Sequence, residues 1–220
     1  MPFATRPAAI IFDLDGTLVD TVGARIDAWA VVLAEYGIPV SRQQLAPMIG
    51  MDGRRLAIEV TAAADIRLGE TGAEAIDRRA GEAFEERNRA PRPLPGAREA
   101  LARLDAAGVS WAIATSSRAE QVASSVGALA LAMPPRIIDG SAVAHAKPAP
   151  DLLLLAARQL GADPERCWYV GDSTWDMRAA VAAGMLAIGV TAGAAAGADE
   201  LYAAGAAIVL ETLDELEAPD

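Results

Sequence analysis

The second half of the chain repeats a helical stretch, a glycine and a short apolar run, and this rhythm restricts the fold more than any other feature. A glycine commonly ends a helix, and strands without polar alternation are typical of a sheet that is covered on both faces. The pattern therefore predicts an α/β core with a parallel sheet. The helices are expected at residues 97–107, 150–160, 174–183 and 199–204, and the strands at residues 109–114, 167–170, 186–190 and 207–210.

One further buried strand is expected near the start of the chain, at Ala8–Phe12, and two aspartates follow it. Asp13 and Asp15 are separated by one residue, so their side chains start on the same side of an extended segment. The carboxyl end of a parallel strand is where open α/β sheets bind ligands. Two such close carboxylates need a cation or a shared proton, and Mg²⁺ prefers oxygen ligands. The alternative is a polar turn, since Asp-Gly pairs such as Asp15-Gly16 are common in turns.

Residues 19–90 lack the helix–glycine–strand rhythm and carry helical periodicity instead. Helices are expected at residues 21–37, 41–49, 54–64 and 73–89. The stretch that follows, residues 90–96, contains three prolines and a glycine, which favour a hinge or linker. The first strand has no partner strand before the repeated helix–glycine–strand pattern of the second half of the chain. We therefore expect residues 1–18 and 91–220 to form the α/β core domain. Residues 19–90 are expected to form an inserted helical cap domain.

Charge and composition exclude several classes of partner. The net charge of −11 repels nucleic acid and anionic membranes, and no basic cluster offsets it. Although 53% of the residues are hydrophobic, no apolar run is long enough to span a membrane. Residues 1–7 lack the form of a signal peptide, and a single cysteine permits no intrachain disulfide. These features predict a cytoplasmic protein whose partner is a small molecule.

Polar side chains also follow the other expected strands. Thr115 and Ser116 follow the strand at residues 109–114, where hydroxyl and N–H groups can hold phosphate oxygens. Asp172 and Asp176 follow the strand at residues 167–170, and Lys147 is the only lysine of the chain. Each signal has a simpler explanation: hydroxyls and aspartates often cap helices, and a lysine is usually a surface charge.

The order of these signals closely resembles the haloacid dehalogenase superfamily. The most specific motif is the run from Phe12 to Thr21, and Ala146–Asp151 and Val170–Ser173 support it. The resemblance is to the branch with a helical cap inserted after the first motif, similar to phosphoglycolate phosphatase and β-phosphoglucomutase. It implies a Rossmann-like parallel sheet with an inserted α-helical cap.

The resemblance implies a Mg²⁺-dependent phosphatase that acts on a small phosphorylated metabolite through an aspartyl-phosphate. Asp13 would be the nucleophile, and Asp15 would act as general acid and base. Mg²⁺ would be bound by Asp13, the main-chain carbonyl of Asp15 and Asp172, with Asp176 in support. The phosphoryl oxygens would be bound by Thr115, Ser116 and Lys147.

Several alternatives stay open. Mutases of this branch often carry Glu-Asp where this chain has Gly171-Asp172, which favours hydrolysis without excluding a sugar phosphomutase. A non-catalytic phosphate-binding regulatory module is the alternative from a different class. Two adjacent arginines, Arg54 and Arg55, are candidates for contact with the leaving group, although at most one of them is expected to face it.

Overall fold

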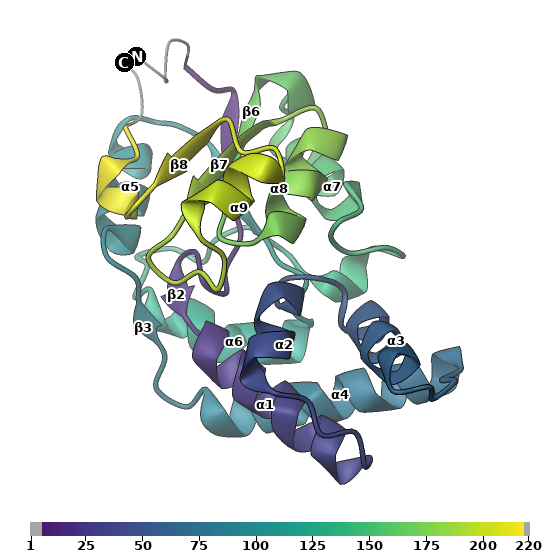
Figure 1. Cartoon of the computed structure of the whole chain (residues 1–220). Helices are drawn as coiled ribbons and strands as arrows, with labels where there is room; N and C mark the ends of the chain where they lie inside the picture. Colours follow the sequence, from purple (N-terminus) through teal and green to yellow (C-terminus); the bar gives the residue numbers. More distant parts are fainter. Residues whose placement is uncertain (1–5, 218–220) are drawn as a thin grey trace.

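The computed structural model describes residues 6–217, and a six-stranded parallel sheet lies at its centre (Figure 1). The ends of the expected core domain, residues 1–5 and 218–220, lie outside the described residues. The strand order is β5-β4-β1-β6-β7-β8. The strands are β1 (Ala9–Phe12), β4 (Trp111–Ala114), β5 (Ile137–Ile138), β6 (Cys167–Gly171), β7 (Leu186–Val190) and β8 (Ile208–Leu210). The predicted α/β fold with a Rossmann-like parallel sheet is confirmed.

Helices cover both faces of this sheet, which explains why its strands lack polar alternation. In β1, Ile10 and Phe12 pack on one face, and Ala9 and Ile11 pack on the other. All four side chains are fully buried, and burying each large one contributes about 1.5–3 kcal/mol. The helices on the Phe12 face are α5 (Ala97–Ala106) and α6 (Ala119–Ala128), and those on the Ile11 face are α7 (Asp151–Leu160), α8 (Thr174–Ala182) and α9 (Ala198–Ala203).

Four further helices form a layer of their own, drawn below the sheet in Figure 1. We call them the helical layer. Its hydrophobic cluster includes Trp29, Leu33, Ile76 and Phe84, and Trp175 of α8 joins the cluster from the core. The members are α1 (Val22–Glu35), α2 (Arg42–Leu45), α3 (Gly53–Ala63) and α4 (Glu70–Arg87). The helical layer therefore has a hydrophobic core distinct from the two clusters that cover the sheet.

The two connections between the helical layer and the sheet differ from the sequence prediction. Residues 19–20 lie in the segment that was expected to be helical, yet they form β2 (Val19–Asp20), which pairs antiparallel with β3 (Arg92–Pro93). Thr21 stands at the N-terminus of α1 without a capping side-chain hydrogen bond, because its hydroxyl donates to Asp15 at 2.7 Å. The stretch expected to be a hinge or linker is therefore paired with the segment that enters the helical layer.

Smaller differences also have local causes. The helix expected at residues 41–49 is α2 followed by the 3-10 turn Ala46–Met48, in which Pro47 lacks the N–H that a continuous helix needs. The sequence prediction contained neither α6 nor β5. Other 3-10 turns are Gly140–Ala142, Pro164–Arg166 and Leu213–Glu215.

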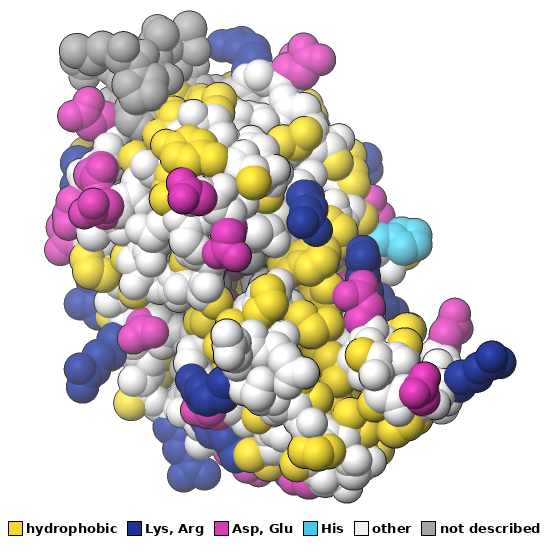
Figure 2. Space-filling view, viewed as in Figure 1, with side chains coloured by type: hydrophobic (Ala, Val, Ile, Leu, Met, Phe, Trp, Pro, Cys, Tyr) yellow, Lys and Arg dark blue, Asp and Glu magenta, His cyan; other side chains and the backbone are white. Residues whose placement is uncertain are grey.

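Acidic and basic side chains are interspersed on the face shown in Figure 2. Hydrophobic side chains gather where the sheet and its covering helices meet the helical layer. This face carries no large basic patch, in keeping with the net charge of −11. Among residues 6–217, no helix has both the length and the apolar character that crossing a membrane requires.

Candidate active site

Three of the candidate residues follow strands of the parallel sheet and meet at its carboxyl edge. Asp13 follows β1, Thr115 follows β4 and Asp172 follows β6, and these three strands are neighbours in the order β4-β1-β6. A cavity of about 60 Å³ lies between this edge and the helical layer. Its lining residues are Asp13, Asp15, Arg25, Trp29, Met48, Ile49, Gly50, Met51, Gly53, Leu56, Asp77, Thr115, Ser116, Ser117, Arg118, Gln121, Lys147 and Asp172.

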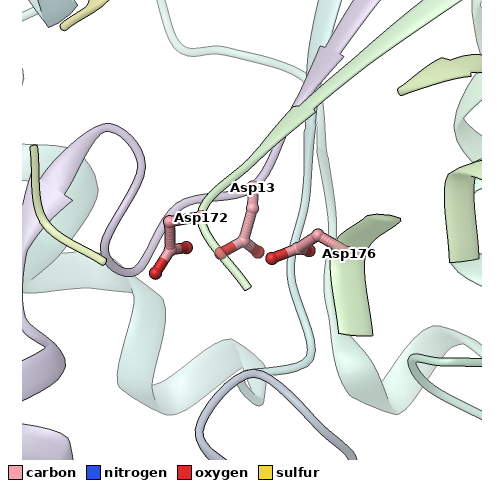
Figure 3. Close-up of side chains that lie close together, drawn as sticks. All are labelled: Asp13, Asp172 and Asp176. Carbon is pink, nitrogen blue, oxygen red and sulfur yellow. The ribbon is translucent and has the colours of Figure 1, made fainter. Parts of the chain in front are cut away.

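Three buried carboxylates come close together at this edge. Figure 3 shows Asp13 between Asp172 and Asp176, and one oxygen of each lies within 4.8 Å of the other two. Burial raises the pKa of Asp13 to about 7, although Lys147 opposes this shift. Burial, together with the charges of Asp176 and Asp13, raises the pKa of Asp172 well above its ordinary value. The cluster therefore has more negative than positive charge around it.

The ammonium group of Lys147 supplies positive charge to this cluster. Its ammonium donates to Asp13 at 2.5 Å, to Asp176 at 2.7 Å and to the hydroxyl of Tyr169 at 3.1 Å. The side chain is 1% exposed, and burial alone would lower its pKa, yet the two carboxylates hold the pKa above its ordinary range. Lys147 is therefore a buried, protonated partner of Asp13, unlike the surface charge that a single lysine ordinarily is.

Asp176 is held more firmly than its two neighbours. Its Oδ1 accepts from Lys147 and from the Tyr169 hydroxyl, and its Oδ2 accepts from the main-chain N–H and the hydroxyl of Ser173. Ser173 also caps α8, so the same contacts begin the helix and orient the carboxylate. Asp176 thus has few lone pairs left for a ligand, and its contact with Lys147 holds the ammonium in place beside Asp13.

The donor set fits a hard divalent cation. Only oxygens are offered, which suits Mg²⁺, and the raised pKa values of Asp13 and Asp172 show that a positive charge would be favourable there. Asp172 accepts from the Thr17 hydroxyl through Oδ1 at 3.0 Å. Its Oδ2 packs against Gly16, where an added Cβ would lie 2.3 Å away. Gly16 has φ of +85° as well, so both the turn and the approach of Asp172 require glycine.

Asp15 lies in a different environment from Asp13. Its carboxylate accepts from Arg25 at 2.8 Å, from Ser117 at 2.5 Å and from Thr21 at 2.7 Å. Although burial favours the neutral form, the charge of Arg25 and these hydrogen bonds hold the pKa of Asp15 below its ordinary value. Arg25 and the hydroxyl donors thus favour the ionised form of Asp15, whereas burial favours the neutral form of Asp13 when no cation is bound.

The hydroxyl side chains after β4 line the same cavity. Thr115 is 1% exposed, and its Oγ accepts from the N–H of Ser117 in a tight turn. The hydroxyl of Ser116 donates to the carbonyl of Gly50 in the helical layer at 3.2 Å. The structure thus brings the candidate residues Thr115 and Ser116 to Asp13, Asp15, Lys147 and Asp172.

Arg54 and Arg55, of which at most one was expected to face the leaving group, do not line this cavity. Arg54 pairs with Asp52 at 3.1 Å and reaches the carbonyl of Ala144. Arg55 pairs with Glu59 one turn further along α3. Both side chains line a second cavity, between α3 and the segment around His145, and the Arg55 guanidinium lies 5.4 Å from the ring centre of Trp175. His145, which had no assigned role, is an exposed residue beside Asp151.

Five polar residues of the cavity wall were absent from the sequence prediction: Arg25, Asp77, Ser117, Arg118 and Gln121. Ser117 and Arg118 directly follow Thr115 and Ser116, so their proximity to these candidates could have identified them. Arg25, Asp77 and Gln121 are on helices, where a polar residue ordinarily faces solvent, and nothing in the sequence distinguishes them. Only the packing of the helical layer against the core brings them into one wall.

Comparisons with known proteins agree with this geometry. The model of the family "Haloacid dehalogenase-like hydrolase" matches residues 10–190. The probable phosphatase IndB of Dickeya dadantii is 33% identical over 94% of this chain and 90% of its own length. Phosphoglycolate phosphatase 1 of Pseudomonas aeruginosa is 34% identical over 87% of this chain and 72% of its own length. A crystal structure of a hydrolase from Pseudomonas syringae has a TM-score of 0.89 and 33% identity, and the match covers 93% of this chain and 94% of that one.

Proposed function

Because the chain belongs to the haloacid dehalogenase-like hydrolase family and has phosphatase relatives, we propose that it is a Mg²⁺-dependent phosphatase of a small phosphate monoester, acting through an aspartyl-phosphate. The observation that carries the proposal is the buried cluster of Asp13, Asp172 and Asp176 around the single ammonium of Lys147. A phosphoryl group carries negative charge, so a site for it must add positive charge beside the nucleophile. Mg²⁺ would supply that charge.

The proposed division of labour follows the chemistry of each side chain. The carboxylate of Asp13 attacks phosphorus and forms the aspartyl-phosphate, and the bond to the ester oxygen breaks. Asp15, which is ionised beside Arg25, would take up a proton as the negatively charged substrate binds. It would give this proton to the departing oxygen and later take a proton from the attacking water, which contributes roughly 10²–10⁴-fold. Asp13, the main-chain carbonyl of Asp15 and Asp172 would hold Mg²⁺. Asp176 would orient this set through Lys147.

The phosphoryl oxygens are proposed to be held by Lys147, Thr115 and Ser116. Lysine suits this task because its ammonium is a compact point charge. In the structure the three protons of this ammonium point to Asp13, Asp176 and Tyr169. We therefore expect the incoming phosphoryl group to take over one of these hydrogen bonds, which would free Asp13 to act as a nucleophile.

We propose further that residues 19–90 act as a cap on a core of residues 1–18 and 91–220. Support comes from the separate hydrophobic cluster of the helical layer and from the cavity that lies between this layer and the sheet edge. The paired strands β2 and β3 are the only two connections between the two parts along the chain. A cap that closes over the cavity would exclude water from the reacting phosphoryl group.

Hydrolysis is favoured over the sugar phosphomutase alternative by one steric observation. A Cβ added at Gly171 would lie 2.5 Å from Cβ and Cγ of Asp176. The Glu-Asp pair of the mutases therefore does not fit beside Asp176 in this arrangement. A non-catalytic module has no comparable support, because simple phosphate binding does not need three buried carboxylates close together at the site of the anion.

The test uses p-nitrophenyl phosphate with Mg²⁺, and Asp13→Asn as the variant. We expect EDTA to abolish turnover, and Asp13→Asn to lower kcat by roughly 10³–10⁶-fold because its amide is not a nucleophile. Asp199→Asn, which alters an exposed carboxylate of α9, is the matched control and should retain full activity. Asp15→Asn should accumulate phosphoryl groups on the peptide that contains Asp13, detected by mass spectrometry. Turnover near the control level by purified, folded Asp13→Asn would refute the assignment of the nucleophile.

A further inference from the structure

We propose that the substrate's leaving group is a short polyhydroxylated chain that carries neither a carboxylate nor a second phosphate. This inference rests on the proposed phosphatase function and concerns the part of the substrate that is not transferred. With the phosphoryl group at Asp13, the leaving group would extend toward the part of the cavity wall that the helical layer contributes. The charges in that wall decide which leaving group it accepts.

Every cationic side chain that lines the cavity, among the described residues, is already paired with carboxylates. Arg25 and Lys147 neutralise the aspartates at the sheet edge, and Arg118 neutralises two carboxylates of α4. No guanidinium is thus left over for an anionic leaving group. The pairs are Arg25 with Asp15 at 2.8 Å, Lys147 with Asp13 at 2.5 Å and with Asp176 at 2.7 Å, and Arg118 with Asp77 at 2.7 Å and with Glu74 at 2.8 Å.

Asp77 is the residue that selects against an anion. It comes from α4 and lines the cavity, and its Oδ2 accepts from both Nε and a terminal nitrogen of Arg118. Its Oδ1 packs against the first turn of α3, where a Cβ added at Gly53 would lie only 1.9 Å away. Glycine at this position is what leaves room for the carboxylate. A substrate carboxylate would have to compete with Asp77 for Arg118 and would meet a like charge in the wall.

Hydroxyl groups match the same wall without this conflict. A hydroxyl can donate to the carboxylate of Asp77 and accept from the guanidinium of Arg118, whereas a carboxylate can only accept. Beside these two groups the wall is apolar, with Trp29, Met51 and Leu56, which can pack against the C–H groups of a carbon chain. A cavity of about 60 Å³ favours a chain of few carbons.

The test compares two pairs of phosphate esters that differ only in a carboxylate. Glycerol 3-phosphate is paired with 3-phosphoglycerate, and 2-hydroxyethyl phosphate is paired with 2-phosphoglycolate. For the wild-type protein with Mg²⁺ we expect kcat/KM to be at least about tenfold higher for the hydroxyl member of each pair, because an unmatched buried polar group discriminates strongly. Turnover of p-nitrophenyl phosphate is measured in parallel.

The variant Asp77→Asn removes the negative charge beside Arg118 and keeps an oxygen that can accept from its guanidinium. Its ratio of kcat/KM for hydroxyl over carboxylate esters should fall by about tenfold, mainly through a lower KM for the carboxylate esters. Glu82→Gln changes an exposed carboxylate on the same helix and should leave the ratio unaltered. If Asp77→Asn does not fold, the wild-type ratios still test the proposal.

The outcomes separate this proposal from the proposed function. A wild-type protein that hydrolyses p-nitrophenyl phosphate but prefers 2-phosphoglycolate or 3-phosphoglycerate overturns the proposal and leaves the phosphatase function standing. Hydrolysis of p-nitrophenyl phosphate with no turnover of either hydroxyl ester overturns it as well. No hydrolysis of any ester with Mg²⁺ overturns the phosphatase function, and this proposal with it.

Discussion

Replacing Asp176 by asparagine tests how the buried charges of the site are held. The Asp176 carboxylate is fully buried and accepts four hydrogen bonds, from Lys147 at 2.7 Å, Tyr169 at 2.8 Å, and the N–H and hydroxyl of Ser173 at 3.0 and 2.5 Å. Asparagine keeps the shape but offers one acceptor oxygen and no charge. Its NH₂ group must then face either Lys147 or the N–H of Ser173, both of which are donors.

Breaking a buried ion pair by removing one partner costs about 3–5 kcal/mol. Lys147 keeps its contact with Asp13, and asparagine keeps one oxygen, so we expect a loss near the lower limit, about 3 kcal/mol. With a urea m-value of roughly 2–3 kcal/mol/M, the unfolding midpoint should fall by about 1–1.5 M. The unfolding should be followed by circular dichroism in EDTA, so that no bound cation contributes to the stability.

The matched control is Asp199→Asn, which should change the free energy of unfolding by less than about 0.5 kcal/mol because its carboxylate is exposed. If Asp176→Asn shifts the midpoint no more than this control does, the Asp176 charge does not stabilise Lys147, and the account of the buried cluster is wrong. A change in the Mg²⁺ concentration needed for activity, with an unaltered midpoint, would instead indicate that Asp176 acts on the cation alone.

Two further outcomes follow from the same charges. Since the folded-state pKa of Asp13 is about 7 and its ordinary value is 3.8, the folded cation-free protein binds more protons than the unfolded chain between these limits, and its stability should fall as the pH rises from about 4 to about 7. Mg²⁺ should therefore raise Tm more at pH 7.5 than at pH 4.5, and an equal rise at both would contradict the role of the carboxylates in binding it. Lys147, 1% exposed and protonated, should resist acetylation in the native protein and react fully after unfolding. Peptide mapping that finds Lys147 acetylated in the folded protein would show that the cavity opens readily.

The parallel sheet could be predicted because its signals are local. Each glycine that ends a helix, and each apolar run that follows, reports on backbone conformation and burial within a few residues. Asp13, Thr115 and Asp172 were found for the same reason, since each stands directly after a strand and parallel strands end at one edge. The limits of these elements differ from the prediction by a few residues at most.

Long-range contacts decided what local signals left open. Arg25 reaches Asp15, and Arg118 reaches Asp77, only because the helical layer packs on the sheet edge. A polar residue on a helix has the same sequence signature whether it meets solvent or a buried carboxylate. The pairing of residues 19–20 with residues 92–93 likewise joins segments more than seventy positions apart. The sequence by itself thus determined five of the six strands, all but β5, and the residues at their carboxyl ends. The tertiary structure decided which charges neutralise one another in the cavity, because that depends on distances that no local pattern encodes.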